Sequence, residues 1–471
     1  MRSSTWGGIL AAGIVLLLFQ FSAVLFANPQ AAEDAEDRPS PPLPRARGGP
    51  LVRIRKNRSP SPFVAQERNT VARVQAATSP PEEPLEDVSD RVHAFYYPWY
   101  GAPSIDGEWQ HWNHEIMPHW DQATTNRYPK GKHVPPADVG ANFFPSLGPY
   151  SSLNASVVEQ HFRWLKRAGV GVCVTSWYPP TASDPAQRES VEHSDSVVPL
   201  LLKTGEKIGI KIAFHLEPYA HRSALSVKRD LQYLVQTYGG SPAFYRCASR
   251  NHLPVVYVYD SYHTSARDWA SILSPSGPSS IRGTDHDAIM LALWVKGDSP
   301  SSSAGIEPFV AASHFDGAYT YFAGSKFAWG SNPQNWASLR ATTRRNNLMF
   351  SPSVGPGYID TRVRPWNSQN TISRGNQGSH YDRVFEAAVN TCPEFISITS
   401  FNEWHEGTQI EPAMDMSEVR ALRSRAIASG LKRAPGWDSL EGYYDYGRIG
   451  PHGYLDKTRH WVKRYSAICS R

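Results

Sequence analysis

The sequence has little cysteine and little net charge, and both shortages exclude classes of protein. Its 471 residues include four cysteines, Cys173, Cys247, Cys392 and Cys469, and none of them lies in a CxxC pair. Zinc and thioredoxin-like sites therefore have no support, and four dispersed cysteines fix neither a redox compartment nor a disulfide pairing. The formal charge is only +5 and there is no basic stripe, so nucleic acid is not an expected partner.

Two familiar motifs are also missing. No glycine-rich phosphate loop follows the first predicted strand, which argues against an open dinucleotide-binding sheet. The stretch that begins at His405 starts like the HExxH helix of zinc peptidases, but Gln409 stands where the second histidine is needed. No other cluster has the spacing of metal ligands, so we expect no metal and no cofactor.

Aromatic residues are abundant, by contrast, at 12% of the chain, with 15 Trp and 22 Tyr. Such an excess can mean no more than a well-packed core. It also suits a cleft that stacks on flat apolar ligand faces, such as those of sugar rings.

One long apolar run lies near the amino terminus. Residues 7–27 carry no charge, and 21 residues in a helix are enough to span roughly 30 Å of hydrocarbon. A cleaved signal peptide is the competing interpretation, but its apolar core is usually about 7–15 residues long, and Leu25 stands where a small residue is preferred. We therefore predict a transmembrane signal anchor at 7–27, preceded by a short cytoplasmic tail at 1–6.

The composition changes after this anchor. Residues 28–90 are rich in proline and mixed charge, so they bury too little apolar surface to fold and are expected to form a disordered stem. The charges around the anchor do not decide its orientation. Sequons at Asn57 and Asn154 weakly favour a lumenal body, and Pro60 makes Asn57 a poor acceptor, which leaves Asn154 as the glycosylation candidate.

Strand-like and helix-like patterns alternate over residues 91–471. Apolar runs typical of strands buried on both faces occur at 92–100, 170–178, 210–219, 253–262, 286–295, 315–323, 348–357 and 395–404. Helical patterns occur at 157–169, 197–209, 227–240, 305–314, 332–347, 381–391 and 454–468. This alternation predicts an α/β protein with a parallel sheet, and eight units predict a closed (β/α)₈ TIM barrel.

Reactive groups of such a barrel collect where its strands end. A lone polar residue there more often hydrogen-bonds its own loop, but six similar ends indicate a shared cleft. The residues at these ends are Tyr96, Tyr97, Trp99, Tyr100, Trp177, Tyr178, His215, Glu217, Asp260, Tyr262, Tyr319, Tyr321, Asn402, Glu403 and Glu406.

The last of these ends has two glutamates three residues apart, in the stretch SITSFNEWHEGTQIEP. In a straight strand Glu403 and Glu406 would face opposite ways, but in a helical turn their Cβ atoms would lie about 5–6 Å apart. Glycoside hydrolysis needs one protonated and one ionised carboxyl group, and nearby negative charge and aromatic walls keep one protonated. A surface pair that caps a helix or forms salt bridges is the alternative.

Several motifs together resemble one enzyme family. HAFYYPWYG, SWYPP, YVYDSY, DGAYTYFA, PSVGPGYIDTRVRPWN and ITSFNEWHEGTQIE occur in this order between residues 91 and 411. They resemble the glycoprotein endo-α-1,2-mannosidases, glycoside hydrolase family 99. The resemblance implies a retaining enzyme that cuts an internal α-1,2-mannosidic bond in glucosylated high-mannose N-glycans of glycoproteins and releases glucosyl-mannose.

The resemblance also implies roles for individual residues. Glu403 matches the base that takes the proton of the mannose 2-hydroxyl, giving a 1,2-anhydro sugar, and Glu406 matches the general acid and base. Matches to sugar-binding positions are Tyr97, Tyr178, Glu217, Tyr321, Arg364 and Asn402. Tyrosine at position 178 resembles the animal enzymes rather than bacterial mannan-cutting ones.

Anchor and stem are similar to those of the animal members, which are single-pass type II proteins of the Golgi membrane. The resemblance therefore implies a lumenal catalytic domain at 91–471. A tethered lectin-like relative, which binds high-mannose glycans with weak or no cleavage, is the alternative. The intact pair Glu403 and Glu406 favours the enzyme.

Overall fold

The computed structural model describes residues 88–182, 193–295, 306–324, 327–430 and 442–469. The predicted tail, the anchor and nearly all of the stem lie outside these ranges. Within them, no helix is both long enough and apolar enough to cross a membrane. The first strand begins at Ser89, two residues before the barrel boundary expected at Arg91.

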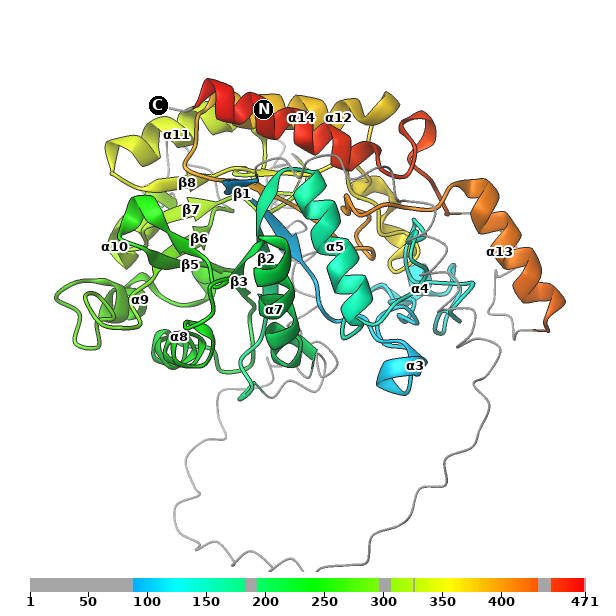
Figure 1. Ribbon diagram of the computed structural model, residues 1–471, viewed down its shortest axis with the longest axis horizontal. Helices are drawn as coiled ribbons and strands as arrows, with labels where there is room; N and C mark the ends of the chain where they lie inside the picture. Colours follow the sequence, from blue (N-terminus) through cyan, green and yellow to red (C-terminus); the bar gives the residue numbers. More distant parts are fainter. Residues whose placement is uncertain (1–87, 183–192, 296–305, 325–326, 431–441, 470–471) are drawn as a thin grey trace, which may run out of the picture. The chain divides into compact units, whose positions relative to one another are not determined.

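Nine parallel strands form a nearly closed ring, drawn at the centre of Figure 1. They are β1 (Ser89–Tyr96), β2 (Val170–Trp177), β3 (Lys211–Leu216), β5 (Leu253–Val258), β6 (Ile289–Leu293), β7 (Gly317–Tyr319), β8 (Met349–Ser351), β9 (Ser353–Val354) and β10 (Ile396–Ile398). Hydrogen-bonded neighbours follow the order β8-β7-β6-β5-β3-β2-β1-β10-β9. The short β4 (Arg246–Cys247) pairs antiparallel with β5.

Pro352 alone separates β8 from β9, so one stretch of chain pairs with β7 at its start and with β10 at its end. If β8 and β9 are counted as one strand, the ring has the eight strand positions that the sequence predicts. The α/β class and the parallel, TIM-like barrel are therefore confirmed. The strands carry the expected continuous apolar pattern, and all eight residues of β2 are buried.

Helices surround the strands (Figure 1). The longer ones are α5 (Ala155–Arg167), α7 (Val198–Ile208), α8 (Ala224–Tyr238), α9 (Ala266–Leu273), α10 (Ile306–Ser313), α11 (Trp336–Arg345), α12 (Ser379–Asn390), α13 (Met416–Ala428) and α14 (Gly453–Ile468). Shorter turns are α3 (Pro103–Asp106), α4 (Gln122–Thr125), η3 (Ala248–Arg250), η4 (Ser261–His263), η5 (Pro333–Asn335), η6 (Pro365–Asn370), η7 (Asn376–Gly378) and η8 (Gly447–Ile449).

Helix α5 shows how the sequence sets these elements. The side chain of Asn154 caps the helix by accepting the backbone N–H two residues further on, at 3.0 Å. Val158, Phe162 and Leu165 follow at helical spacing and all three are buried. Gly169 stops the helix with a φ of 75°, a conformation that favours glycine, and leads directly into β2.

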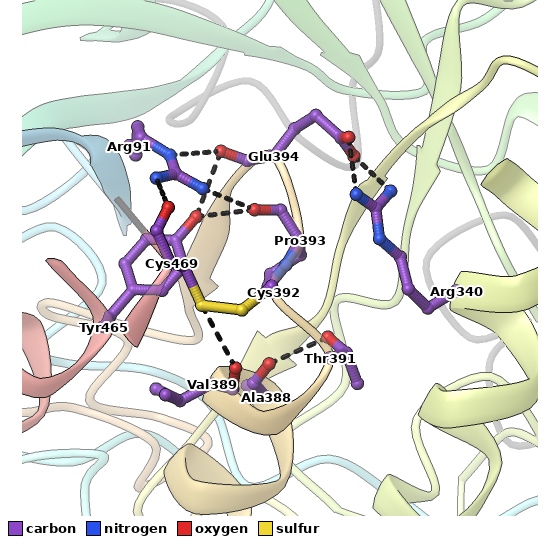
Figure 2. The surroundings of a disulfide bond; sticks show 10 residues. All are labelled: Arg91, Arg340, Ala388, Val389, Thr391, Cys392, Pro393, Glu394, Tyr465 and Cys469. Atoms are coloured by element: carbon purple, nitrogen blue, oxygen red, sulfur yellow. Dashed lines mark hydrogen bonds and ion pairs between the residues drawn. A yellow bond between two sulfur atoms is a disulfide. The ribbon is translucent and has the colours of Figure 1, made fainter. Parts of the chain in front are cut away.

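A disulfide joins Cys392, just before β10, to Cys469, just after α14 (Figure 2). The guanidinium of Arg91 in β1 donates to the backbone carbonyls of Pro393 at 2.8 Å, Glu394 at 3.2 Å and Cys469 at 2.9 Å. These contacts tie the start of the first strand to the start of the last one. They lie at the amino-terminal end of the strands, the end that stabilises such barrels rather than the end that reacts.

Candidate active site

The chain after β10 folds back on itself instead of continuing straight. The backbone N–H of Glu403 donates to Ser400 Oγ at 2.7 Å, and a turn at 404–407 follows. Gly407 takes a φ of 60°, and a Cβ there would lie 2.6 Å from the carbonyl of Ile359, so glycine is required. This turn places Glu406 beside Glu403, as a shared cleft requires.

Glu403 is almost completely buried, with 4% of its surface exposed. Burial raises the pKa of its carboxyl well above the usual value, and the negative charge of Glu406 raises it further. Backbone N–H groups act in the opposite direction, because that of His405 donates to Glu403 Oε1 at 3.1 Å and that of Glu406 also faces the carboxylate. Arg364 stabilises the ionised form as well.

Glu406 is half-buried, and burial raises the pKa of its carboxyl to about 7. Arg364 lowers this pKa, whereas the charges of Asp360 and Glu217 raise it. Asp360 is fully buried and accepts a hydrogen bond from Arg364 at 3.0 Å and one from the hydroxyl of Tyr358 at 2.9 Å. Asp360 therefore fixes the guanidinium of Arg364 next to Glu406.

The two raised pKa values have one chemical consequence. Because burial raises the pKa of both carboxyls, and the charge of Glu406 raises that of Glu403 further, the pair Glu403 and Glu406 retains a proton near neutral pH. One member can then act as an acid while the other acts as a base.

Tyr97 and Tyr321, from the ends of β1 and β7, meet through a hydrogen bond between their hydroxyl groups. Burial raises the pKa of both phenols well above the usual value, and the charges of Glu217 and Glu406 raise both further. Both hydroxyls therefore stay protonated and can donate hydrogen bonds. Tyr321 takes a φ of 55°, and its backbone N–H donates to Ser353 Oγ at 2.7 Å, which fixes the ring.

Glu217 follows β3 and is 7% exposed. Its Oε1 accepts a hydrogen bond from Ser176 Oγ at 2.8 Å and lies 3.1 Å from Nδ1 of His215, without the alignment of a hydrogen bond. Its charge acts on Tyr97, Tyr321 and Glu406. The structure thus brings Glu217, Arg364, Tyr97, Tyr321, Glu403 and Glu406 together, and their roles in catalysis and sugar binding stay predictions.

Asn402 lies behind the cleft rather than on its surface. It is fully buried, its Oδ1 accepts the backbone N–H of Tyr97 at 2.7 Å, and its Nδ2 donates to the backbone carbonyl of Tyr97 at 2.9 Å. These bonds fix the position of Tyr97, so Asn402 acts on the cleft through Tyr97 in this structure. A direct sugar contact by Asn402 stays a prediction.

Tyr178 and Asn154 stay predictions too. Tyr178 lies just after β2 and is 4% exposed; its backbone N–H donates to the hydroxyl of Ser194 at 3.1 Å, and its carbonyl accepts from that hydroxyl at 3.2 Å. These bonds place its main chain but do not link it to the glutamates. Asn154 is half-buried at the start of α5, where its Oδ1 serves as the helix cap.

Glu411 is a residue of this site that the sequence reasoning missed. It is fully buried, and its carboxylate accepts from Trp404 Nε1 at 2.9 Å, from the hydroxyl of Tyr150 at 2.8 Å and from His161 Nε2 at 3.1 Å. Trp404 lies between the two glutamates in the sequence, so Glu411 anchors the turn that carries them. Its place in the motif TQIE was visible, but its distant partners were not.

His405 was also missed as part of the site. Its Nε2 donates to the backbone carbonyl of His111 at 2.9 Å, and its Nδ1 lies 3.8 Å from Glu403 Oε1. Burial lowers the pKa of His405 well below the usual value, and the neighbouring His114 and His111 lower it further. His405 is therefore neutral and does not pair with Glu403 as a cation.

Among the described residues, no group of three or more His, Cys, Asp and Glu side chains is arranged to hold a metal ion. The site offers two carboxyl groups with raised pKa values, the buried Glu403 and the half-buried Glu406, beside an arginine and phenolic hydroxyls. On a (β/α) barrel, at the ends of its strands, this arrangement defines a glycoside hydrolase.

The comparisons with known proteins identify the family. The model of glycosyl hydrolase family 99 matches residues 87–467. The glycoprotein endo-α-1,2-mannosidase of Rattus norvegicus is 43% identical over 386 residues, 82% of this chain and 77% of the relative. The glycoprotein endo-α-1,2-mannosidase-like protein of Homo sapiens is 43% identical over 387 residues, 82% of this chain and 78% of the relative. The chain therefore belongs to glycosyl hydrolase family 99, the endo-α-1,2-mannosidase family that its motifs resemble.

A solved structure agrees with this assignment. The GH99 endo-α-mannosidase of Bacteroides thetaiotaomicron is 36% identical, with a TM-score of 0.69, over 82% of this chain and 100% of that one. The similarity thus extends from the sequence motifs to the whole barrel.

Proposed function

We propose that this protein is a retaining endo-α-1,2-mannosidase that cleaves glucosylated high-mannose N-glycans and releases glucosyl-mannose. Family membership and the endo-α-1,2-mannosidase activity for which the rat relative is named support the reaction type. The observation that carries the proposal is the pair Glu403 and Glu406 on one turn at the strand ends, whose raised pKa values keep a proton available for acid catalysis.

Glu403 and Glu406 act in two steps. In the first step, Glu403 takes the proton of the mannose 2-hydroxyl while the 2-oxygen of the mannose attacks the anomeric carbon. The bond from the anomeric carbon to the leaving oxygen breaks, and Glu406 gives its proton to the leaving oxygen. In the second, Glu406 takes a proton from water, which attacks the anomeric carbon and opens the 1,2-anhydro sugar. Glu403 returns its proton to the 2-oxygen, and two inversions give net retention.

When the substrate is bound, Glu406 must be protonated, because it is the acid, and Glu403 must be ionised, because it is the base. In the free site burial raises the pKa of both carboxyls. A bound substrate distinguishes the two groups: its 2-hydroxyl donates to Glu403 and stabilises the carboxylate, while its glycosidic oxygen accepts from Glu406 and stabilises the acid. Substrate binding therefore sets the reactive protonation state.

The other residues bind and orient the sugar. Tyr97 and Tyr321 present protonated hydroxyls, Glu217 accepts hydrogen bonds from sugar hydroxyls, and Arg364 limits how far the pKa of Glu406 rises. Tyr178 contacts the sugar beyond the cleaved mannose. Asn402 holds Tyr97 in place in the cleft.

For the location, we propose a single-pass type II protein of the Golgi membrane, anchored through residues 7–27, with its barrel in the lumen. The disulfide between Cys392 and Cys469 supports this, since disulfides persist in oxidising compartments. Protease added to intact Golgi vesicles should leave the barrel uncut until detergent is added. Digestion of the barrel while lumenal markers survive would contradict the orientation.

The activity is tested with the full-length chain in detergent and a glucosylated high-mannose N-glycan. Release of glucosyl-mannose, with the α-anomer formed first in a proton NMR time course, is the expected result. Binding of the glycan without any cleavage would support a lectin-like protein instead. The equal identity to an endo-α-1,2-mannosidase and to an endo-α-1,2-mannosidase-like protein makes this experiment necessary.

A further inference from the structure

Trp120 is the most exposed of the large apolar side chains in the described part of the chain, with 61% of its surface in solvent. An indole this exposed leaves an apolar face in water, where it costs free energy unless a ligand covers it. A lone exposed apolar residue would carry little meaning. Trp120, however, belongs to a cluster.

Three rings form this cluster, which we call the Trp120 platform: His119, Trp120 and Trp366. The ring centroids of His119 and Trp120 are 3.5 Å apart, and the ring of Trp366 stands edge-on to both, at 4.9 Å from His119 and 5.5 Å from Trp120. Trp366 is 8% exposed, so it supports the platform from beneath while Trp120 faces solvent.

Backbone contacts hold the platform in place. Trp366 Nε1 donates to the carbonyl of Met117 at 3.0 Å, and the N–H of Met117 donates to the carbonyl of Val363 at 2.9 Å. Thr125 donates its hydroxyl to the carbonyl of His119 at 2.8 Å. The exposed ring is therefore presented by a fixed loop, which lowers the entropy cost of using it to bind.

The platform is continuous with the active site. Trp366 follows Arg364 by two residues, and the charge of Arg364 acts directly on Glu406. The loop that carries Trp120 also carries His114, which packs against His405 with ring centroids 4.8 Å apart and feels the charge of Arg364. The platform thus lies on the side of the cleft where Arg364 and Glu406 stand.

We propose that the Trp120 platform is a sugar-binding subsite for the leaving part of the glycan. This inference rests on the proposed function, in which Glu406 protonates the leaving oxygen, so the sugars attached to that oxygen extend from its side of the cleft. A pyranose presents an apolar C–H face that stacks on an indole. His119 adds a polar partner: its Nδ1 accepts the backbone N–H of Asp121 at 3.0 Å, so Nε2 carries the ring proton and can donate to a sugar hydroxyl.

The test uses two substrates and the full-length enzyme. A glucosylated high-mannose glycan has leaving sugars, whereas glucosyl-mannosyl α-fluoride has none. Trp120→Ala should raise KM for the glycan about three- to tenfold, the range of one aromatic stacking contact, while the kinetics with the fluoride stay the same. Trp120→Phe, which keeps a ring, should restore most of the affinity.

Ile468→Ala is the matched control, because Ile468 is 49% exposed but lies beside Cys469 at the other end of the barrel. It should change neither substrate's KM. An unchanged KM for the glycan in Trp120→Ala, or an equal rise for both substrates, would overturn the subsite.

Direct binding separates this proposal from the proposed function. In a Glu403→Gln background, Trp120→Ala should weaken glycan binding about three- to tenfold and leave glucosyl-mannose binding unchanged. If the wild-type chain cleaves nothing, the proposed function fails, but this binding difference still supports the platform. If the wild type cleaves the glycan and Trp120→Ala binds it normally, only the platform is wrong.

Discussion

Removing the disulfide between Cys392 and Cys469 should lower stability without changing the chemistry. The bond closes a loop with a sequence separation of 77 residues. In the chain-entropy description, cross-linking a loop of this length stabilises the folded state by about 4.5 kcal/mol at 25 °C. With an unfolding entropy of about 2.1 cal/mol/K per residue, a barrel of roughly 380 residues should then lose about 6 °C in Tm.

The site itself should be little affected. The disulfide and the Arg91 contacts lie where β1 and β10 begin (Figure 2), whereas Glu403 comes five residues after the end of β10 in the sequence. Along β1, the six-residue rise from Arg91 to Tyr97 in the cleft covers about 20 Å. The double variant Cys392→Ala/Cys469→Ala should therefore keep kcat within about twofold at temperatures well below its transition.

Thermal unfolding followed by circular dichroism, with turnover assayed on the same samples, is the appropriate measurement. Cys247→Ala is the control, since Cys247 is a buried free thiol outside the disulfide. It should shift Tm far less than the double variant, and reductant should lower the Tm of Cys247→Ala but not that of the double variant. A double variant with the Tm of the wild type would refute the claim that this bond fastens the barrel.

Three further predictions concern the site. Arg364→Gln removes a cation that lowers the pKa of both Glu403 and Glu406, so the acidic limb of the kcat/KM profile, set by the base Glu403, and the alkaline limb, set by the acid Glu406, should both move to higher pH; unmoved limbs would show that Arg364 does not act on the pair. Glu411→Gln weakens the charge-assisted bonds that fix Trp404, so kcat should fall at least tenfold with little change in KM. If kcat of the folded variant stays normal and only Tm falls, Glu411 has a structural role alone. Because two carboxyl groups supply acid and base, chelator should leave activity intact; a loss restored by one divalent ion would overturn this account.

Most of the barrel could be predicted from the sequence because its strands are buried on both faces and read as continuous apolar runs. Helix α9 was not predicted, although its buried residues Trp269, Ile272 and Leu273 follow helical spacing. Helix α13 was also missed, because only Val419 and Arg423 are buried along its 13 residues. The division of one predicted strand at Pro352 follows from proline having no N–H to donate to the sheet.

Only those parts of the site whose residues lie within one sequence motif could be predicted. Glu403 and Glu406 share one turn, so their proximity could be inferred from their spacing. The partners of Glu411 could not, because Tyr150 and His161 lie about 250 residues away and meet it only in the folded chain. The histidines around His405 likewise come from a loop whose path no local pattern predicts.

The separate roles of the two glutamates are the central claim, and one comparison tests them most directly. Glu406→Gln and Glu403→Gln are each assayed on the natural glycan and on glucosyl-mannosyl α-fluoride, whose leaving group needs little protonation. Glu406→Gln should lose about 10²–10⁴-fold on the glycan and recover much of this on the fluoride, because only the acid is missing. Glu403→Gln should stay slow on both while still binding ligand, because both substrates need the 2-hydroxyl deprotonated. Equal rescue of the two variants on the fluoride, or near-normal cleavage of the glycan by either one, would contradict the account.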